Sequence, residues 1–577
     1  MSDEPVSVDK LARTAKTVAL AAVPLLLLVL LVVSIVQREY AEPLFVHTTY
    51  FLLLVTVVTW AATYLHVACA LKRADVIAWI KDNLAGIALA LVVTVVAGLA
   101  IDPALRVLSD EAGLVGTSRN FFLNKTATFT TTGKYYYDQF WENGLVIDRR
   151  PCLFPFLVSL LHVLRGYSYT NAFLLNLIVL PVFVLVAYRI GKLLAGESFG
   201  LVAGVFVVTQ PITLISARSG GFDCLAALFA LLVAHGFLAH ARNPSPARLA
   251  ILWMNLCMFA EVRYETALFL PLVVILLLGF RLAPWEHLKP FAPVYALTPA
   301  YLLPRIWQSM LLGDVPEQEP GAVTFSLQNF VNNAREYFKP IFSPFDFHLP
   351  HSALILALGV VGTVLAVRWG WARMRARAWQ APELRFGVMV VAWMALQTAI
   401  IFSYVWGRAQ HPGSARLVIT IDTWFAFLGA WTLVAMLKRL RPYFSILVAA
   451  AIFATYLPVA AQHRIQNELT LTREAATAWR FFASLHEKRI LIVADRPSLY
   501  TIMEYGALDY DTARQDALLL PALSRRLFYD VYLVQKISLT THQPVPQHEI
   551  WPDRPRQTVL EFQNDANAMI RISRLER

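Results

Sequence analysis

Acidic side chains stand at two points where the chain leaves or enters an apolar run, and a charge in such a place costs free energy unless it serves a site or pairs with another charge. Asp110 and Glu111 follow one apolar run, and Asp223 begins another. A simpler alternative is that Ser109 or Asp110 caps a helix, and that Asp223 does the same with Arg218 as its counter-ion. The sequence leaves both interpretations open, so Asp110, Glu111 and Asp223 are candidate catalytic residues.

Basic side chains near the same boundaries suit a phosphate group, because a guanidinium can donate two parallel charge-assisted hydrogen bonds to phosphate oxygens. The candidate substrate-binding residues are Arg150, Arg218, Arg263, Arg408, His411 and Arg416. Arg263 lies in the segment 261–265, whose charges could instead neutralise one another in a turn. The group around Arg408 could instead bind lipid headgroups at the membrane surface.

The composition places these residues in a membrane protein. Of the 577 residues, 57% are apolar and only 15% are charged, and the mean hydropathy is +0.54. Soluble domains carry about a quarter of their residues charged, which excludes that class. The net charge of +11 arises from residues between apolar runs, so it indicates a membrane and no nucleic acid. The cysteines lack CxxC spacing and companion histidines, so we expect neither a zinc site nor a disulfide scaffold.

Thirteen apolar segments are long enough, or nearly so, to cross a bilayer, which takes about 20 helical residues. Their predicted ranges are 18–36, 49–71, 84–101, 170–188, 198–216, 223–240, 249–261, 265–280, 291–312, 351–368, 386–405, 416–437 and 442–460. The first lacks a small-residue cleavage site, so we expect a retained helix rather than a signal peptide. The seventh and eighth are short and could form one broken hairpin.

The positions of lysine and arginine predict the orientation. With the N-terminus in the cytoplasm, the basic short loops all fall on that side: 72–81, 189–192, 242–248, 281–289, 368–385 and 438–441. The sequence therefore predicts a multi-pass protein of the cell (inner) membrane, with a cytoplasmic N-terminus and an extracytoplasmic C-terminal domain. The candidate acids and bases then share the outer side, as a site for a membrane-borne anionic substrate requires.

Three parts are expected along the chain. Residues 1–83 form an N-terminal two-helix extension, residues 84–461 a transmembrane core with outward loops at 102–150 and 313–350, and residues 462–577 a soluble α/β domain. In that domain, apolar residues at helical spacing over 475–485 predict a helix, and the runs 490–493 and 531–534 predict buried strands. The segment 151–164 is too short to span, so we expect an interfacial helix with His162 and Arg165 towards water.

The order of these clusters resembles that of the GT-C integral membrane glycosyltransferases, with the closest likeness to protein O-mannosyltransferases and lipid A aminoarabinose transferases. The resemblance covers roughly residues 84 to 436. It rests on Asp110-Glu111 after a span, Arg150-Pro151-Cys152 before an interfacial helix, Ala217-Arg218 with Asp223, and Glu261-Val262-Arg263 before an apolar run.

This resemblance implies a polytopic α-helical membrane fold of about 13 transmembrane helices with the small C-terminal domain. It also implies a glycosyltransferase that moves a hexose or pentose from a polyprenyl-phosphate carrier to a lipid, glycan or protein acceptor on the outer face of the membrane. Asp110 would be the base, and Glu111 and Asp223 would orient the acceptor or a divalent cation, Mg or Mn, which only some members need. The sequence assigns no cofactor. A polytopic transporter or lipid flippase stays open as the alternative, because many spans with charges on one side also fit a carrier.

Overall fold

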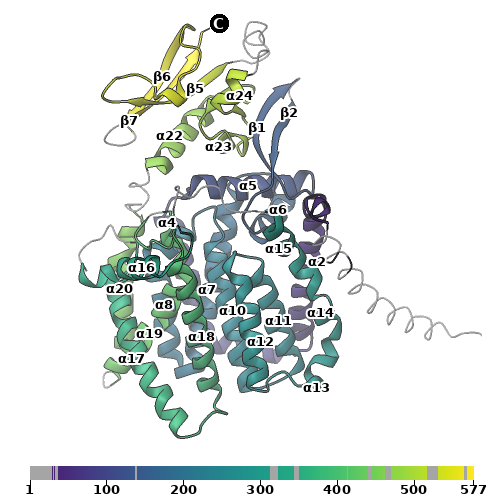
Figure 1. Cartoon of the computed structure of the whole chain (residues 1–577). Helices are drawn as coiled ribbons and strands as arrows, with labels where there is room; N and C mark the ends of the chain where they lie inside the picture. The colour runs from purple at the N-terminus through teal and green to yellow at the C-terminus, as the bar shows by residue number, and fades with distance from the viewer. Residues whose placement is uncertain are drawn as a thin grey trace, which may run out of the picture.

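The computed structural model describes Val29, Val32 and the ranges 37–136, 139–311, 323–343, 350–411, 413–438, 443–461, 470–515, 530–563 and 568–576. The predicted first span, 18–36, therefore lies almost wholly outside the described residues. A helix bundle makes up most of the chain, and a seven-stranded sheet stands at one end of the bundle (Figure 1).

Seven helices in the described part of the chain are long and apolar enough to cross a membrane. They are α2 (Ala41–Cys69), α7 (Asn171–Ala195), α10 (Asp223–Arg242), α17 (Ala353–Arg375), α18 (Pro382–Ser403), η4 (Ala415–Val418) together with α19 (Ile419–Leu437), and α20 (Tyr443–Ala461). The pair α3 (Arg73–Asp82) and α4 (Leu84–Ala100) passes the same test together and bends by 63°. The prediction of a multi-pass helical membrane protein is confirmed, whereas the count of thirteen spans stays a prediction.

Several predicted spans are broken or shortened helices. The segment predicted at 198–216 divides into α8 (Glu197–Thr209) and α9 (Pro211–Ser216), because Pro211 cannot donate the backbone hydrogen bond that would continue α8. The remaining bundle helices are α11 (Pro246–Ala260), η2 (Glu265–Leu268), α12 (Phe269–Gly279), α13 (Trp285–Leu288), η3 (Lys289–Phe291), α14 (Ala292–Ala296), α15 (Thr298–Leu311) and α16 (Leu327–Phe342). Such breaks are tolerated at membrane depth where neighbouring helices cover the backbone.

Two helices lie between the bundle and the sheet, α5 (Leu108–Leu123) and α6 (Leu153–Arg165) (Figure 1). Helix α6 confirms the helix predicted over 151–164, and Arg165 is exposed as expected. The prediction that His162 faces water is wrong. Its side chain is buried and hydrogen bonds to Ser118 Oγ at 3.0 Å and to the Asn171 amide at 2.8 Å, because α5 packs over that face of α6.

The C-terminal residues form the sheet domain that the sequence predicts. The expected helix is α22 (Thr470–Ser484), and the two expected buried strands are β3 (Leu491–Ala494) and β5 (Val531–Ser538). The other elements are α23 (Ser498–Thr501), β4 (Gly506–Leu508), α24 (Tyr510–Gln515), η5 (Pro546–His548), β6 (Arg556–Gln563) and β7 (Ala568–Leu575).

The sheet also takes in a hairpin from the segment 102–150, predicted as an outward loop, and the sequence does not predict this hairpin. Strands β1 (Phe129–Tyr136) and β2 (Gln139–Val146) extend the sheet in the order β2-β1-β4-β3-β5-β7-β6, and β1 pairs with β4 antiparallel at Gly133 and Ala507. The hydroxyl of Thr501 also donates to the Thr130 carbonyl at 2.9 Å. The loop between two membrane helices is therefore joined to the C-terminal domain by backbone pairing.

Close packing of α17 on α19 depends on glycine. A Cβ added at Gly362 would lie 2.2 Å from the Leu428 carbonyl oxygen, far inside van der Waals contact, whereas one added at Gly370 on the same helix would meet nothing within 4 Å. Small residues of this kind let membrane helices approach each other closely.

We therefore expect Gly362→Ala to destabilise the protein by about 1–3 kcal/mol, the usual cost of overpacking. Gly370→Ala is the matched control and should leave stability unchanged or raise it, because Ala has the higher helix propensity. Thermal unfolding of both purified variants in detergent measures the difference. Equal melting temperatures would contradict the packing described here.

Candidate functional site

The first turn of α5 carries two acidic residues whose side chains do different things. Helix α5 has Val107 as its N-cap, and no side chain caps it. The alternative interpretation, in which Ser109 or Asp110 caps this helix, is therefore wrong. Asp110 instead turns towards two arginines, and Glu111 is fully buried beside the loop that precedes α10.

Asp110 is held between two guanidinium groups that come from distant parts of the chain. Arg150 contacts Oδ1 and Arg416 contacts Oδ2, and the exposed fractions of the three side chains are 22% for Asp110, 20% for Arg150 and 8% for Arg416. Burial opposes ionisation of the carboxyl, but the charges of Arg416 and Arg150 prevail and lower the pKa of Asp110 to about 2. Asp110 is thus ionised, partly accessible and clamped.

Glu111 fastens two loops together. Its Oε2 accepts a hydrogen bond from the Arg106 backbone N–H and another from the Gly220 backbone N–H, both at 2.9 Å. A Cβ added at Gly220 would lie 2.9 Å from the Leu105 side chain, so glycine allows this close approach. Burial raises the pKa of Glu111 above its ordinary value. These contacts describe a positioning residue rather than a group that meets a substrate.

Asp223, the first residue of α10, is surrounded by arginines. Arg106 Nη2 lies 3.3 Å from Oδ2, Arg416 Nη1 lies 3.7 Å from the same oxygen, and Arg263 contacts Oδ1. The side chain of Asp223 is fully buried. Arg416 therefore joins the two predicted catalytic aspartates, Asp110 and Asp223, through one guanidinium. Arg263 also pairs with Glu265 at 2.7 Å, as the self-neutralising turn predicts.

Two further charged residues contact these side chains, and neither is identified from the sequence as a site residue. Arg106 is 1% exposed and also donates to the Ser216 hydroxyl at 2.6 Å, and Asp148 is 2% exposed and pairs with Arg150 at 2.8 Å. Burial raises the pKa of Asp148 even though Arg150 opposes the rise. A charged residue within five positions of a predicted site residue is the signal that could have found both.

We name these residues the acid–arginine cluster. Its members are Asp110, Glu111, Asp148 and Asp223 with Arg106, Arg150, Arg263 and Arg416. They come from the segment between α4 and α5, from α5 itself, from the loop after the hairpin, from the start of α10, from the turn after α11 and from η4. Ion pairs and hydrogen bonds connect all of these segments with α5, which lies between the bundle and the sheet (Figure 1).

Three predicted substrate-binding residues lie apart from these contacts. Arg218 donates from Nε to the Ile101 carbonyl at 2.9 Å and does not pair with Asp223. Arg408 is exposed. His411 is also exposed, with its Nδ1 3.5 Å from the Ser414 hydroxyl. Of the six predicted binding residues, the structure thus brings Arg150, Arg263 and Arg416 to the carboxylates.

The donor set of the cluster does not fit a divalent cation. Among the described residues, no group of three or more His, Cys, Asp or Glu side chains is placed to hold a metal ion. Asp110 and Asp223 each face guanidinium groups, and Glu111 accepts from backbone N–H groups. A metal needs such carboxylates free as ligands, and in this cluster other groups occupy them.

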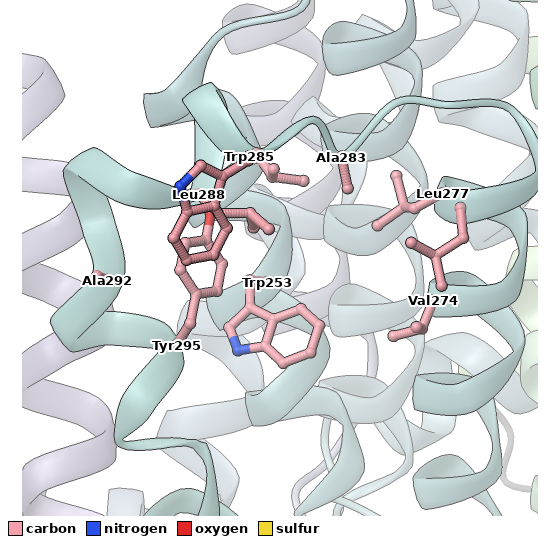
Figure 2. Close-up of a pocket in the computed structure, with 10 residues that line it drawn as sticks. Trp253, Val274, Leu277, Ala283, Trp285, Leu288, Ala292 and Tyr295 are labelled. Atoms are coloured by element: carbon pink, nitrogen blue, oxygen red, sulfur yellow. The ribbon is translucent and has the colours of Figure 1, made fainter. Parts of the chain in front are cut away.

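A separate apolar pocket of about 350 Å³ lies among α11, α12, α13 and α14. Figure 2 shows Trp253, Trp285 and Tyr295 around it, with no charged side chain in its lining. Helix α13 lies at the end of the bundle opposite the sheet (Figure 1), so this pocket is distant from the carboxylates. It offers no group for acid, base or phosphate chemistry.

The fold is similar to that of a known membrane enzyme. The crystal structure of ArnT from Cupriavidus metallidurans in the apo state aligns over 86% of this chain and 98% of its own, with 14% identity and a TM-score of 0.52. The structure of ArnT from the same organism bound to undecaprenyl phosphate aligns over 84% and 97%, with 14% identity and a TM-score of 0.50. Neither protein-family models nor curated protein sequences match the chain. ArnT is a GT-C glycosyltransferase, so the predicted GT-C-like fold is confirmed.

Proposed function

We propose that this protein is a GT-C glycosyltransferase that moves a sugar from a polyprenyl-phosphate carrier to an acceptor on the outer face of the cell membrane. In this proposal the N-terminus is cytoplasmic and the sheet domain is extracytoplasmic, as the basic loops predict. The ArnT structure with undecaprenyl phosphate supports the choice of carrier, since the two chains share a fold.

The observation that carries the proposal is the placement of Asp110 between Arg150 and Arg416, at the end of the helix bundle that faces the sheet (Figure 1). One partly accessible carboxylate with two guanidinium groups supplies both a proton acceptor and an anion site. The carrier phosphate needs the anion site, and the acceptor hydroxyl needs the proton acceptor.

The reaction can be written with these groups. The acceptor oxygen attacks the anomeric carbon, and the bond between that carbon and the phosphate oxygen breaks, with its electron pair leaving on the phosphate. The acceptor proton passes to Asp110. The leaving polyprenyl phosphate gains one negative charge, and guanidinium groups already fixed in the site stabilise that charge as it develops. Arg416 and Arg150 are the groups placed to do so.

Because Arg150 and Arg416 hold Asp110, binding of the donor should change the pKa of this base. A carboxyl with a pKa of about 2 is a weak base, because its proton affinity is low. A carrier phosphate that takes hydrogen bonds from Arg416 and Arg150 would draw them away from Asp110 and so raise its pKa. Asp110 therefore becomes a competent base only when the donor phosphate is in place.

The test is acceptor-dependent release of polyprenyl phosphate by the purified protein in detergent. Polyprenyl-phospho-hexoses and polyprenyl-phospho-pentoses with a radiolabelled sugar would be incubated with envelope lipids, oligosaccharides and peptides, and label in the acceptor would be counted. We expect one donor and acceptor pair to give label transfer together with free polyprenyl phosphate. Transport of the intact donor across the membrane of protein-containing vesicles, without sugar transfer, would instead support the transporter alternative.

A further inference from the structure

A second cavity, of about 470 Å³, lies where the sheet domain meets the helices. Its walls are the start of α5, the β1–β2 hairpin, the segment 147–150 and the segment 495–499 that follows β3. We name it the sheet-side cavity. It adjoins the acid–arginine cluster, because Arg150 lines the cavity and also contacts Asp110, and because Ser109, beside Asp110 in the chain, lines it too.

We propose that the sheet-side cavity is the acceptor site and that it takes a neutral sugar residue, whose hydroxyl group receives the transferred sugar. This inference rests on the proposed function and assigns the acceptor class to the same site. It also gives the C-terminal domain a role, because Asp495, Arg496 and Ser498 come from that domain.

The charge of the lining argues against an acceptor phosphate. Three carboxylates line the cavity, those of Asp148, Asp495 and Asp509, against three guanidinium groups, those of Arg149, Arg150 and Arg496. Arg150 is already paired with Asp110 and Asp148, and Arg496 Nε lies 3.8 Å from Asp495. In the proposed reaction Arg150 serves the carrier phosphate, so the lining offers a second anion two guanidinium groups against three carboxylates, which opposes its binding.

The polar groups present suit the hydroxyls of a sugar. Ser109, Thr131, Thr132 and Ser498 offer hydroxyls that both donate and accept, and the Asp495 side chain, 66% exposed, offers two accepting oxygens. Phe129 and Leu499 add apolar surface for the carbon face of the ring. Arg150 both lines the cavity and contacts Asp110, so this side chain connects the cavity with the proposed base.

The experiment compares cavity variants in the transfer assay. The acceptor probes are octyl glycosides and the corresponding free oligosaccharides, to tell a glycolipid from a soluble glycan, alongside a phosphorylated glucosamine disaccharide lipid and a Ser/Thr-containing peptide. We expect transfer to a glycoside or oligosaccharide. Asp495→Asn should raise the acceptor KM about 10-fold, since a hydrogen bond to a carboxylate is stronger than one to a neutral amide oxygen. Ser498→Trp, which fills the cavity, should abolish most transfer.

Binding of polyprenyl phosphate separates this inference from the function on which it rests. Both variants should bind polyprenyl phosphate as the wild type does, which also shows that they are folded. The matched control is Asp511→Asn, because that carboxylate is 82% exposed in the same domain and does not line the cavity.

Two results would overturn the acceptor assignment while leaving the glycosyltransferase standing. One is transfer to the phosphorylated lipid or the peptide with no transfer to any sugar probe. The other is an acceptor KM unchanged in Asp495→Asn together with full transfer by Ser498→Trp. If the wild-type protein neither binds polyprenyl phosphate nor consumes a donor with any acceptor, the proposed function itself fails.

Discussion

Asp110→Asn is expected to lower the rate of sugar transfer by roughly 100-fold or more, the usual scale for loss of a general base. Asn keeps the size of the side chain and one oxygen that can accept from Arg150 or Arg416, but it cannot take the acceptor proton. The loss should appear in kcat measured at saturating donor and acceptor. The KM for the donor should change much less, because Arg150 and Arg416 remain and keep their contacts with Asp148 and Asp223.

Asp102→Asn is the control for this substitution, since Asp102 is an exposed carboxylate shortly before α5 in the chain. It should transfer sugar at the wild-type rate. The melting temperature of Asp110→Asn shows whether the cluster still folds. A folded Asp110→Asn protein with wild-type kcat on a hydroxyl acceptor would remove Asp110 from the catalytic role.

The contrast between Asp110 and Glu111 shows which features of the site can be predicted from the sequence and which cannot. Two adjacent acids after an apolar run predict chemistry at that boundary, and the structure places both at the end of the bundle beneath the sheet. Their difference follows from helix geometry, because consecutive residues of a helix point about 100° apart. Glu111 therefore turns into the Gly220 loop and Asp110 turns towards Arg416, and no local pattern states which residue meets which partner.

Long-range pairing explains what the sequence does not predict. Arg106 and Arg218 both follow apolar runs on the predicted outer side, yet Arg106 reaches Asp223 and Arg218 turns to the Ile101 carbonyl. The hairpin β1–β2 is likewise a loop in sequence, and its partner strand, β4, is more than 350 residues further along the chain. Hydropathy and spacing report only local periodicity, so such tertiary contacts stay outside their reach.

The membrane spans are predicted more accurately than the long-range contacts, because a span is encoded by the hydropathy of one continuous segment. Each of the twelve predicted spans outside 18–36 coincides with one or more helices of the described chain. The span predicted at 198–216 differs because the backbone breaks at Pro211. The acid–arginine cluster depends on segments that these helices bring to one end of the bundle, so the approximate position of the site could be predicted while its pairs could not.

Arg416→Lys is expected to raise the KM for polyprenyl-phospho-sugar about 10-fold or more. Arg416 spans Asp110 and Asp223 with two nitrogens, whereas the single ammonium group of Lys keeps the charge and loses that fork. Each charge-assisted hydrogen bond lost contributes about 1.5–3 kcal/mol, and about 1.4 kcal/mol corresponds to a factor of ten. Since the product keeps the phosphate, the inhibition constant of polyprenyl phosphate should rise by a similar factor.

The matched control is Arg335→Lys, because Arg335 is exposed on α16 and belongs to no contact of the cluster. Its donor KM and its inhibition by polyprenyl phosphate should equal those of the wild type. Unchanged values in Arg416→Lys as well would show that the carrier phosphate binds elsewhere. A rise in both constants for Arg416→Lys, beside a loss confined to kcat for Asp110→Asn, would assign anion binding and proton transfer to two neighbouring side chains that contact each other in the absence of substrate.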